Sequence, residues 1–400
     1  MNYKLKNSDI LYNNEQLGPY PDHLLKRVDM PTNAIPGAIP QRKAHADSAE
    51  GRLKRRTDLP EAVMEAKKNM KGKREPLAQA LTQVRAHARA IKESPNPVSE
   101  QQAPIPDDPR VLSRHIKSLG YFLGADAMGI CEIPEYGMYL DDPDGEPIGT
   151  DYKYAIIFAK RKNAKTSFAS SGFDAVFDAC SHQCYQVLGQ WSETVANYIR
   201  RLGFEALASN SRNYVTVMPA LLLAAGLGES GRLGIVVNPF FGPNFKACCV
   251  VTNMPLEPDK PIDFGLQEYC KSCGICAEQC VSKAISRDNE QIEYNGYLKY
   301  KIDYEKCVTL ALMNKKGGSC GRCALMCPWN RPESEPRFFE NWDGDLHKLY
   351  ESVNARAKFL RDNDFVTEES KGGKWWFDLQ EADGRYIIPG HVKFEEEAED

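Results

Sequence analysis

The residues whose types and spacing best fit a chemical role are eight cysteines between Cys270 and Cys327. They form two motifs, Cys270-x2-Cys273-x2-Cys276-x3-Cys280 and Cys307-x12-Cys320-x2-Cys323-x3-Cys327-Pro328. Three thiolates spaced in this way bind one [4Fe–4S] cubane, and the fourth cysteine of such a run ligates a second cubane. The spacing therefore predicts two clusters that exchange one ligand each, the first held by Cys270, Cys273, Cys276 and Cys327 and the second by Cys307, Cys320, Cys323 and Cys280.

Zinc is the alternative for these cysteines, because four-cysteine zinc ribbons also contain C-x2-C pairs. Such ribbons rarely continue into a C-x2-C-x2-C-x3-C run followed by C-x2-C-x3-C-P, so iron–sulfur is favoured. The long gap after Cys307 predicts a loop beside the second site, and Val281 stands where a proline commonly follows the fourth cysteine. The remaining cysteines lie in apolar stretches and are predicted to be inert core residues: Cys131, Cys180, Cys184, Cys248 and Cys249.

The composition limits the class of protein that carries these motifs. Four hundred residues with 42% hydrophobic and 26% charged residues are ordinary for a soluble protein of two or three domains. A net charge of −4 gives no reason to expect nucleic acid, and no uninterrupted run of about 18 apolar residues predicts a membrane span. The N-terminus lacks the apolar region of a signal peptide. We therefore expect a cytoplasmic protein or the mature form of an exported one.

Four regions are expected to position the cysteines. Residues 1–105 are predicted to be an N-terminal extension and linker, whose basic segment 42–93 is a solvated face or a docking patch for an acidic redox partner. An α/β core is predicted over 106–260. Its elements are helices at 110–119 and 173–202 and strands at 127–133, 154–159, 233–237 and 248–252. The cysteine module covers 261–335, and 336–400 form an aromatic-rich wrap on the core.

A glycine-rich loop, Gly226-Leu-Gly228-Glu-Ser-Gly231, matches the dinucleotide fingerprint G-x-G-x-x-G. Its context is wrong, because a helical pattern precedes it and a strand pattern follows it. The acidic residue required about twenty positions further on is also missing, since Glu257 comes too late. The loop is therefore expected to let the backbone approach another large planar cofactor.

These motifs together resemble the corrinoid-dependent reductive dehalogenases over about residues 110–335. The resemblance rests on AGLGESGR at 225–232, NPFFGPNFK at 238–246 and TNMPL at 252–256, followed by the double ferredoxin module. It implies a mixed α+β or α/β fold, with a nitroreductase-like core that binds cobalamin or another corrinoid base-off and an inserted bacterial 2[4Fe–4S] ferredoxin-like module. The cofactor-binding residues it implies are Gly226, Gly228, Glu229, Gly231 and Arg232.

The family's catalytic pair is a tyrosine on a core helix and a Lys or Arg after a Gly-Pro pair, which Tyr185 and Lys246 match. Removal of halogen by reduced cobalt leaves a radical or carbanion that needs a proton. A phenol with a pKa of about 10 remains protonated at neutral pH and can donate it, and an adjacent cation stabilises the phenolate. Asn213 matches a pocket asparagine of some members, with Asn210 as the alternative.

Other side chains are weaker candidates. His182 is predicted to be a core histidine, with a place in the same pocket as the alternative, and three tryptophans are candidates for lining a substrate pocket: Trp329, Trp375 and Trp376.

The resemblance implies reductive removal of halide from an organohalide substrate, with electrons from a low-potential donor. It leaves a membrane-anchoring partner and a homodimer open. Two alternatives remain. An epoxyqueuosine reductase, the related enzyme that acts on tRNA, is expected to have a basic surface and an acidic proton donor. A ferredoxin-type electron carrier needs only a short chain around its clusters.

Overall fold

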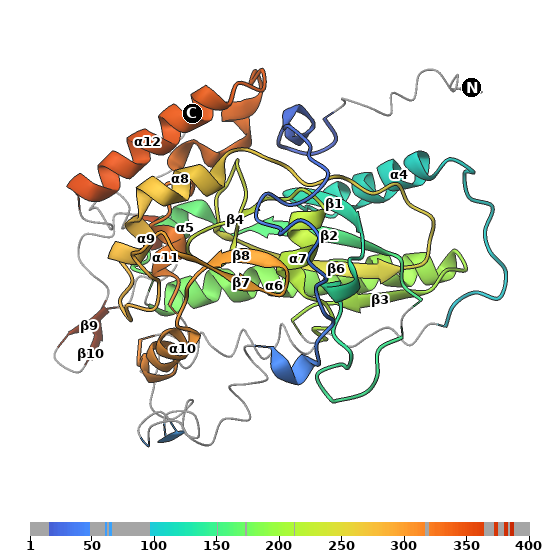
Figure 1. Cartoon of the computed structure of the whole chain (residues 1–400), viewed down its shortest axis with the longest axis horizontal. Coiled ribbons are helices and arrows are strands. Elements are labelled where there is room, and N and C mark those ends of the chain that lie inside the picture. The colour runs from blue at the N-terminus through green and yellow to red at the C-terminus, as the bar shows by residue number, and fades with distance from the viewer. Residues whose placement is uncertain are drawn as a thin grey trace.

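The computed structural model describes residues 16–48, 61, 64, 65, 97–149, 151–172, 174–211, 213–316, 320–363 and 372–374, together with the backbone of 380–382 and 385–387 (Figure 1). Trp375, Trp376, the acidic C-terminus and nearly all of the basic segment 42–93 after residue 48 lie outside these ranges. The predictions made for them are therefore not tested by the structure.

A four-stranded antiparallel sheet lies at the centre of the core, in the order β1-β2-β6-β3. The strands are β1 (Ala127–Glu132), β2 (Tyr154–Arg161), β6 (Phe245–Thr252) and β3 (Ala206–Ser209). β2 and β6 are apolar on both faces because both faces are covered, as their continuous Val, Ile, Ala and Cys runs predict. Three of the predicted core strands are confirmed, and the antiparallel pairing places the fold in the α+β class.

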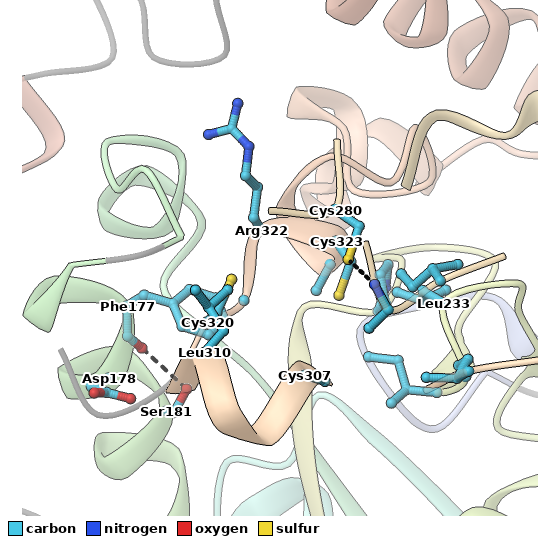
Figure 2. Close-up of a pocket in the computed structure, with 18 of the residues that line it drawn as sticks. Phe177, Asp178, Ser181, Leu233, Cys280, Cys307, Leu310, Cys320, Arg322 and Cys323 are labelled. Carbon is cyan, nitrogen blue, oxygen red and sulfur yellow. Dashed lines mark hydrogen bonds between the residues drawn. The ribbon is translucent and has the colours of Figure 1, made fainter. Parts of the chain in front are cut away.

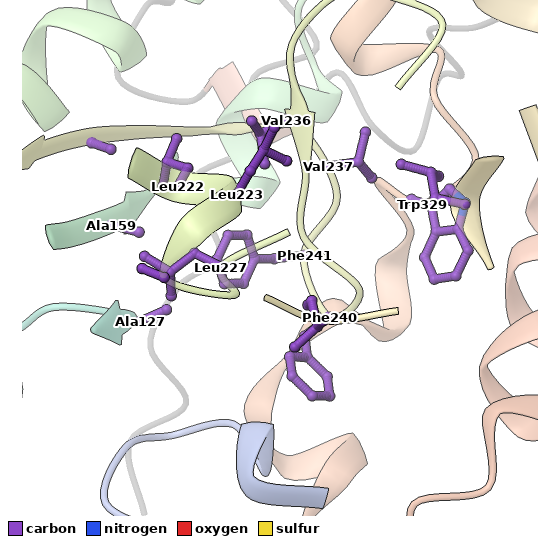
Figure 3. Packing of buried hydrophobic residues seen from close by; sticks show 14 of the residues in the cluster. Ala127, Ala159, Leu222, Leu223, Leu227, Val236, Val237, Phe240, Phe241 and Trp329 are labelled. Carbon is purple, nitrogen blue, oxygen red and sulfur yellow. The ribbon is translucent and has the colours of Figure 1, made fainter. Parts of the chain in front are cut away.

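Side chains that alternate along β2 enter two different hydrophobic clusters, one on each face of the sheet. Ile156 and Phe158 belong to the cluster covered by α4 (Pro109–Phe122) and α6 (Ala175–Arg201). Ile157 and its neighbours Ala155 and Ala159 belong to the larger cluster, which contains α7 (Met218–Ala224) and reaches the cysteine module. Figure 3 shows part of this larger cluster, with α7 and the segment after it packed near β1.

The long helix α6 begins where Asp174 accepts a hydrogen bond from the backbone N–H of Phe177, an N-cap that satisfies one of the free donors of the first turn. One face of α6 packs on the sheet through Leu188, Val195 and Ile199. The short helix α5 (Ala164–Phe168) joins β2 to it. The predicted helix at 173–202 is thus confirmed, and its opposite ends lie at the two ends of the sheet (Figure 1).

The glycine-rich loop forms a tight hairpin, in which β4 (Glu229–Ser230) pairs with β5 (Val236–Val237). The predicted strand at 233–237 is a strand only at Val236–Val237. The reason is a turn in which the Gly234 N–H donates to the Gly231 carbonyl and Gly234 takes a φ of +79°. This left-handed conformation favours glycine and interrupts the extended backbone.

The cysteine module is built from short elements at one end of the sheet (Figure 1). Gly274 takes a left-handed conformation between the first two helices and reverses the chain beside Cys273 and Cys276. The elements are α8 (Leu266–Cys273), α9 (Ile275–Glu278), β7 (Gln291–Tyr294), β8 (Tyr297–Tyr300), α10 (Tyr304–Met313), α11 (Arg322–Leu325) and the 3-10 turn Pro332–Ser334.

The C-terminal region packs on the core, as expected, but it contains a helix that the sequence pattern did not predict. α12 (Leu346–Asp362) buries Leu349, Val353, Ala357 and Leu360 along one face. The other elements of this region are the 3-10 turns Pro336–Phe339 and Gly372–Lys374 and the hairpin of β9 (Gln380–Ala382) and β10 (Arg385–Ile387).

Residues 16–48, expected to belong to an extension, cross the core as a strap. Tyr20 and Leu25 are buried in the larger hydrophobic cluster, and Ala34 forms a backbone bridge to Tyr297 of the cysteine module. The strap contains two 3-10 turns, Asp22–Leu24 and His45–Asp47; another, Glu135–Gly137, follows β1. Among the described residues, no helix has both the length and the apolar character of a membrane span.

Candidate active site and metal centres

A cavity of about 590 Å³ lies where α6, the start of β6, the Leu233–Ile235 turn and the cysteine module meet (Figure 2). Its size falls within the range of small-molecule and cofactor sites, roughly 300–1,000 Å³. Residues of α6 and β6 form one wall of the cavity, and the cysteine module forms the other. Segments far apart in the sequence therefore converge on one volume.

One face of α6 supplies the polar wall of the cavity. Asp178, Ser181, His182 and Tyr185 lie three or four residues apart and so share that face. Ser181 donates a hydrogen bond to the Phe177 carbonyl at 3.1 Å. His182 is buried, as a core histidine would be, yet it lines the cavity beside Tyr185, with 6.5 Å between the ring centroids.

Tyr185 and Lys246 meet in this cavity. The Lys246 Nζ lies 4.9 Å from the centre of the Tyr185 ring, and the two side chains interact electrostatically. Burial alone lowers the pKa of Lys246, but the interaction with Tyr185, helped by Cys184 and Asp178, outweighs burial and raises it above the ordinary value of 10.5. Lys246 therefore stays an ammonium ion next to the phenol.

A second lysine of the cavity, Lys162, was missed by the sequence analysis. It is only 3% exposed, and its Nζ lies 3.6 Å from the centre of the Phe177 ring. Burial lowers the pKa of Lys162 well below its ordinary value, and the neighbouring charge of Lys246 lowers it further. The sequence offers no local signal for it, because Lys162 ends a run of three basic residues, Lys160, Arg161 and Lys162.

Asn213 and Asn210 do not line the cavity, which corrects their predicted place at the site. The Asn210 amide donates to the Ser192 hydroxyl at 3.1 Å, and the Asn213 amide donates to the Ala208 carbonyl at 3.4 Å. The Asn210 amide thus bonds to α6, and the Asn213 amide bonds to β3.

The loop after β3 instead supplies Ser211 and Tyr214 to the cavity. Burial raises the pKa of Tyr214 well above its ordinary value, and Tyr185 contributes to this shift. The buried hydroxyl of Ser211 has no hydrogen-bond partner among the described residues. The loop therefore presents one neutral phenol and one hydroxyl with unused hydrogen-bonding capacity.

The eight clustered cysteines separate into the two groups that the spacing predicts. Burial raises the pKa of Cys327, and the thiols that raise it further are Cys276, Cys270 and Cys273. The corresponding neighbours of Cys323 are Cys320, Cys307 and Cys280. The first quartet lines a small cavity of its own and the second lines the large cavity (Figure 2).

The two quartets offer thiol-only donor sets, which are the ligands of iron–sulfur cubanes. Within the described part of the chain, no group of three or more His, Cys, Asp or Glu side chains is compact enough to hold a single metal ion. Cys276 and Cys323 influence each other electrostatically, so the quartets are neighbours.

Cys280 differs from the other seven cysteines because its pKa is lowered. Burial raises it, but hydrogen bonds from Ser282 and from backbone N–H groups of the following turn outweigh this effect. One of these bonds runs from the Ala284 N–H to the Cys280 sulfur at 3.3 Å. The turn after the first motif thus favours a thiolate pointing toward the second quartet.

The five residues of the glycine-rich loop that were expected to contact the corrinoid do not line the large cavity. Glu229 accepts hydrogen bonds from the N–H groups of Phe264, at 2.8 Å, and Leu266, at 3.3 Å. Arg232 donates to the Cys270 carbonyl at 3.1 and 3.0 Å. Gly226, Gly228 and Gly231 permit the close contacts of this hairpin with residues 260–262 and 233–237. The loop therefore holds the cysteine module against the core.

Trp329 also lies elsewhere than expected. It is 1% exposed, packs edge-to-face on Phe264 at 4.9 Å and lines the small cavity of the first quartet rather than the large one. The five predicted inert cysteines are all buried, as expected.

Comparison with known proteins agrees with this arrangement. Residues 269–330 match the family model of a 4Fe-4S double cluster binding domain. A tetrachloroethene reductive dehalogenase of Sulfurospirillum multivorans is 29% identical over 268 residues, which cover 58% of this chain and 53% of that protein.

Two solved structures are similar over nearly the whole chain. One is a catabolic reductive dehalogenase in complex with 3-bromo-4-hydroxybenzoic acid, with a TM-score of 0.76 and 30% identity over 95% of this chain and 54% of that one. The other is a reductive dehalogenase structure described as suggesting a mechanism for B12-dependent dehalogenation, with a TM-score of 0.75 and 31% identity over 94% and 54%.

The protein is thus a mixed helix–sheet protein with a double-cluster module. Its relatives are reductive dehalogenases, which confirms the resemblance and the fold expected from the sequence. The chain spans about half the length of these relatives.

Proposed function

We propose that the protein is a reductive dehalogenase that converts an organohalide, two electrons and a proton into the dehalogenated compound and a halide ion. The observation that carries this proposal is the meeting of two kinds of group in one cavity. The Tyr185–Lys246 pair forms part of one wall, and the second cysteine quartet forms part of another. A proton donor and an electron source thus face the same volume.

The cavity fits a corrinoid, the cofactor named for one of the similar structures. Its volume suits a large ligand, and the buried Ser211 hydroxyl offers an unused hydrogen-bonding group. Tyr214, Ile235 and Ile302 supply apolar or aromatic surface on its walls. When bound there, a corrinoid supplies a reduced cobalt centre able to deliver electrons to a carbon–halogen bond.

The two quartets define an order for electron delivery. The second quartet lines the large cavity, so its cluster is the one beside the cofactor. The first quartet lies in the separate small cavity with Tyr269 and Trp329, and adjoins the second through Cys276 and Cys323. Electrons from a low-potential donor therefore pass through the first cluster and then the second.

Tyr185 supplies the proton in this proposal. Its hydroxyl reaches the cavity from α6, and the ammonium of Lys246 stabilises the phenolate left behind. A shift of one pKa unit corresponds to about 1.4 kcal/mol, so a single nearby cation alters proton donation measurably. Since Lys246 retains its charge across the neutral range, the pair is ready for donation at physiological pH.

The alternatives explain these observations less well. A ferredoxin-type carrier has no use for a cavity of this size beside one cluster, nor for a buried tyrosine–lysine pair. An epoxyqueuosine reductase is expected to have an acidic proton donor where Tyr185 lies. The acidic residue on this face of α6, Asp178, lies two helical turns before Tyr185 and therefore does not occupy that position.

The test is anaerobic reconstitution followed by a halide-release screen. The full chain should bind about eight irons and one corrinoid. With reduced viologen as electron source, it should release halide from at least one compound in a panel of aryl and alkyl halides. Iron–sulfur absorbance without corrinoid uptake would support the carrier alternative, and corrinoid binding without any halide release would refute dehalogenation of the panel's substrate classes.

A further inference from the structure

A second cavity, of about 480 Å³, lies directly beyond Lys162. We call it the basic cavity, because Lys160, Arg161, Lys162 and Lys165 line it. Lys162 also lines the large cavity that contains Tyr185 and Lys246. Since no other residue is common to the two linings, the Lys162 side chain stands at the boundary between them.

The charges around the basic cavity are not balanced. Its two carboxylates are already paired, Asp126 with Lys160 at 3.1 Å and Glu335 with Arg161 at 3.1 Å. Within the described residues, neither Lys162 nor Lys165 has a carboxylate partner within 4 Å. Lys160, Arg161 and Lys165 alone outnumber the two carboxylates, so the site has a net positive charge, with Lys162 buried, Arg161 largely buried and Lys165 exposed. Such a charge is costly unless an anion accompanies it.

Arg161 gives a second, independent indication of an anion. Its side chain is 9% exposed, and Nη1 donates to the Ser334 carbonyl at 2.9 Å. Its Nη2 is buried and has no hydrogen-bond partner among the described residues. A buried guanidinium nitrogen without an acceptor is unusual, because buried polar groups are normally satisfied by protein or by a bound species.

Cys184 shows how closely the cations gather at the boundary. Burial raises the pKa of its thiol to about 12, while Lys162, Lys246 and Lys160 act in the opposite direction. The thiol donates a weak hydrogen bond to the Arg161 carbonyl at 3.7 Å. Cations from both cavities therefore act on one neutral thiol, and the positive potential is continuous from the Tyr185–Lys246 pair to the basic cavity.

We propose that the basic cavity binds the halide ion released in the reaction, with Lys162 as the side chain that receives it from the active cavity. This inference rests on the proposed function. When the carbon–halogen bond breaks, its electron pair leaves with the halogen, so the product is a monovalent anion formed next to two lysines. An anion next to the Lys162 amine favours its protonated form, which burial disfavours, and Arg161 and Lys165 extend the contact away from the reacting carbon.

The first test is direct observation of bromide bound to the full-length holoprotein. Crystals soaked in sodium bromide should show an anomalous scattering peak in contact with Lys162 and Arg161. Lys162→Met should lose the peak, and Lys162→Arg should keep it. Lys153→Met removes an exposed lysine at the opposite end of β2 and is the matched control. A peak that persists in Lys162→Met, or no peak in the unmodified protein, overturns the inference.

The second test is product inhibition. Bromide should inhibit dehalogenation, and Lys162→Met should weaken this inhibition roughly tenfold, the loss expected for one charged contact. Equal inhibition constants in the two proteins would contradict the role of Lys162. If bromide binds at Lys162 but no organohalide is reduced, the proposed function fails and the anion site stands. If halide is released without bromide binding there, only this inference fails.

Discussion

The Lys246 ammonium lies 4.9 Å from the centre of the Tyr185 ring, with one residue on β6 and the other on α6. The register of the sheet fixes this relationship, because Lys246 pairs with Lys160 near the end of β2, where α6 crosses β6. The packing of α6 on β6 thereby holds the Tyr185 and Lys246 side chains close together. The predictions for both residues depend on this contact.

Replacing Tyr185 by Phe should lower the dehalogenation rate by about 10²–10⁴-fold, because the variant loses the proposed proton donor and keeps the ring. Iron and corrinoid content should be unchanged, since the ring still fills its place in the wall. Tyr198→Phe on the same helix, where the hydroxyl contacts His115 at 2.9 Å, is the control. Turnover of Tyr185→Phe within a few-fold of the unmodified rate would remove Tyr185 from the mechanism.

Lys246 should influence the pH dependence of the rate. Its raised pKa means that the folded protein holds the proton to higher pH than the unfolded chain does. The charge and its stabilising contribution are therefore fully present below pH 10.5 and are lost as the pH rises through the raised value. Lys246→Met should lower the rate at every pH below that range and change the shape of the alkaline limb. An unchanged profile would count against the charge-assisted donor; Lys153→Met is the control.

The cysteine grouping predicts which substitutions share a phenotype. Cys280→Ser should lose the cluster beside the large cavity, although Cys280 belongs to the first motif in sequence, and Cys327→Ser should lose the other cluster. Each variant should retain about four of eight irons. Iron analysis and paramagnetic resonance of the reduced proteins distinguish the clusters, and Cys131→Ala is the control with full iron. Identical spectra for the two Ser variants would contradict the exchange.

Glu229 should be important for attachment of the cysteine module. Glu229→Ala leaves the Phe264 and Leu266 N–H groups without their acceptor, which should cost about 2–4 kcal/mol. The expected readout is a lower midpoint of anaerobic thermal unfolding and a faster loss of iron. Glu257→Ala, at an exposed acid outside the hairpin, should leave iron retention unchanged. Full iron retention in Glu229→Ala would argue against this role.

The sequence predicted the parts of the protein that depend on local spacing. The cysteine runs place their thiols a few residues apart, so the quartets follow from the motif once the ligand exchange is assumed. The apolar run that forms β2 and the stripe of α6 are likewise local signals. Tyr185 and Lys246 came only from the family resemblance, because nothing local distinguishes Tyr185 from a core tyrosine.

The errors arose where tertiary contacts decide. Lys162 is buried only because Phe177 and the start of α6 cover it, and no sequence pattern shows that covering. Glu229 and Arg232 were expected to contact the cofactor because of the family resemblance of their loop. Their side chains instead reach residues 35 or more positions away in the cysteine module. The strap was missed because the apolar residues around Tyr20 and Leu25 follow neither a helical nor a strand period.

The strap of residues 16–48 connects the cysteine module to the core. Arg27 pairs with Ile262 at the entrance to the module, Asn33 donates to the Leu298 carbonyl, and Tyr20 packs on Phe240 of the core. Any outward swing of the module must therefore peel this segment away as well. A segment that supplies no cluster ligand and does not line the large cavity thus helps to keep the cysteine-rich wall of that cavity in place.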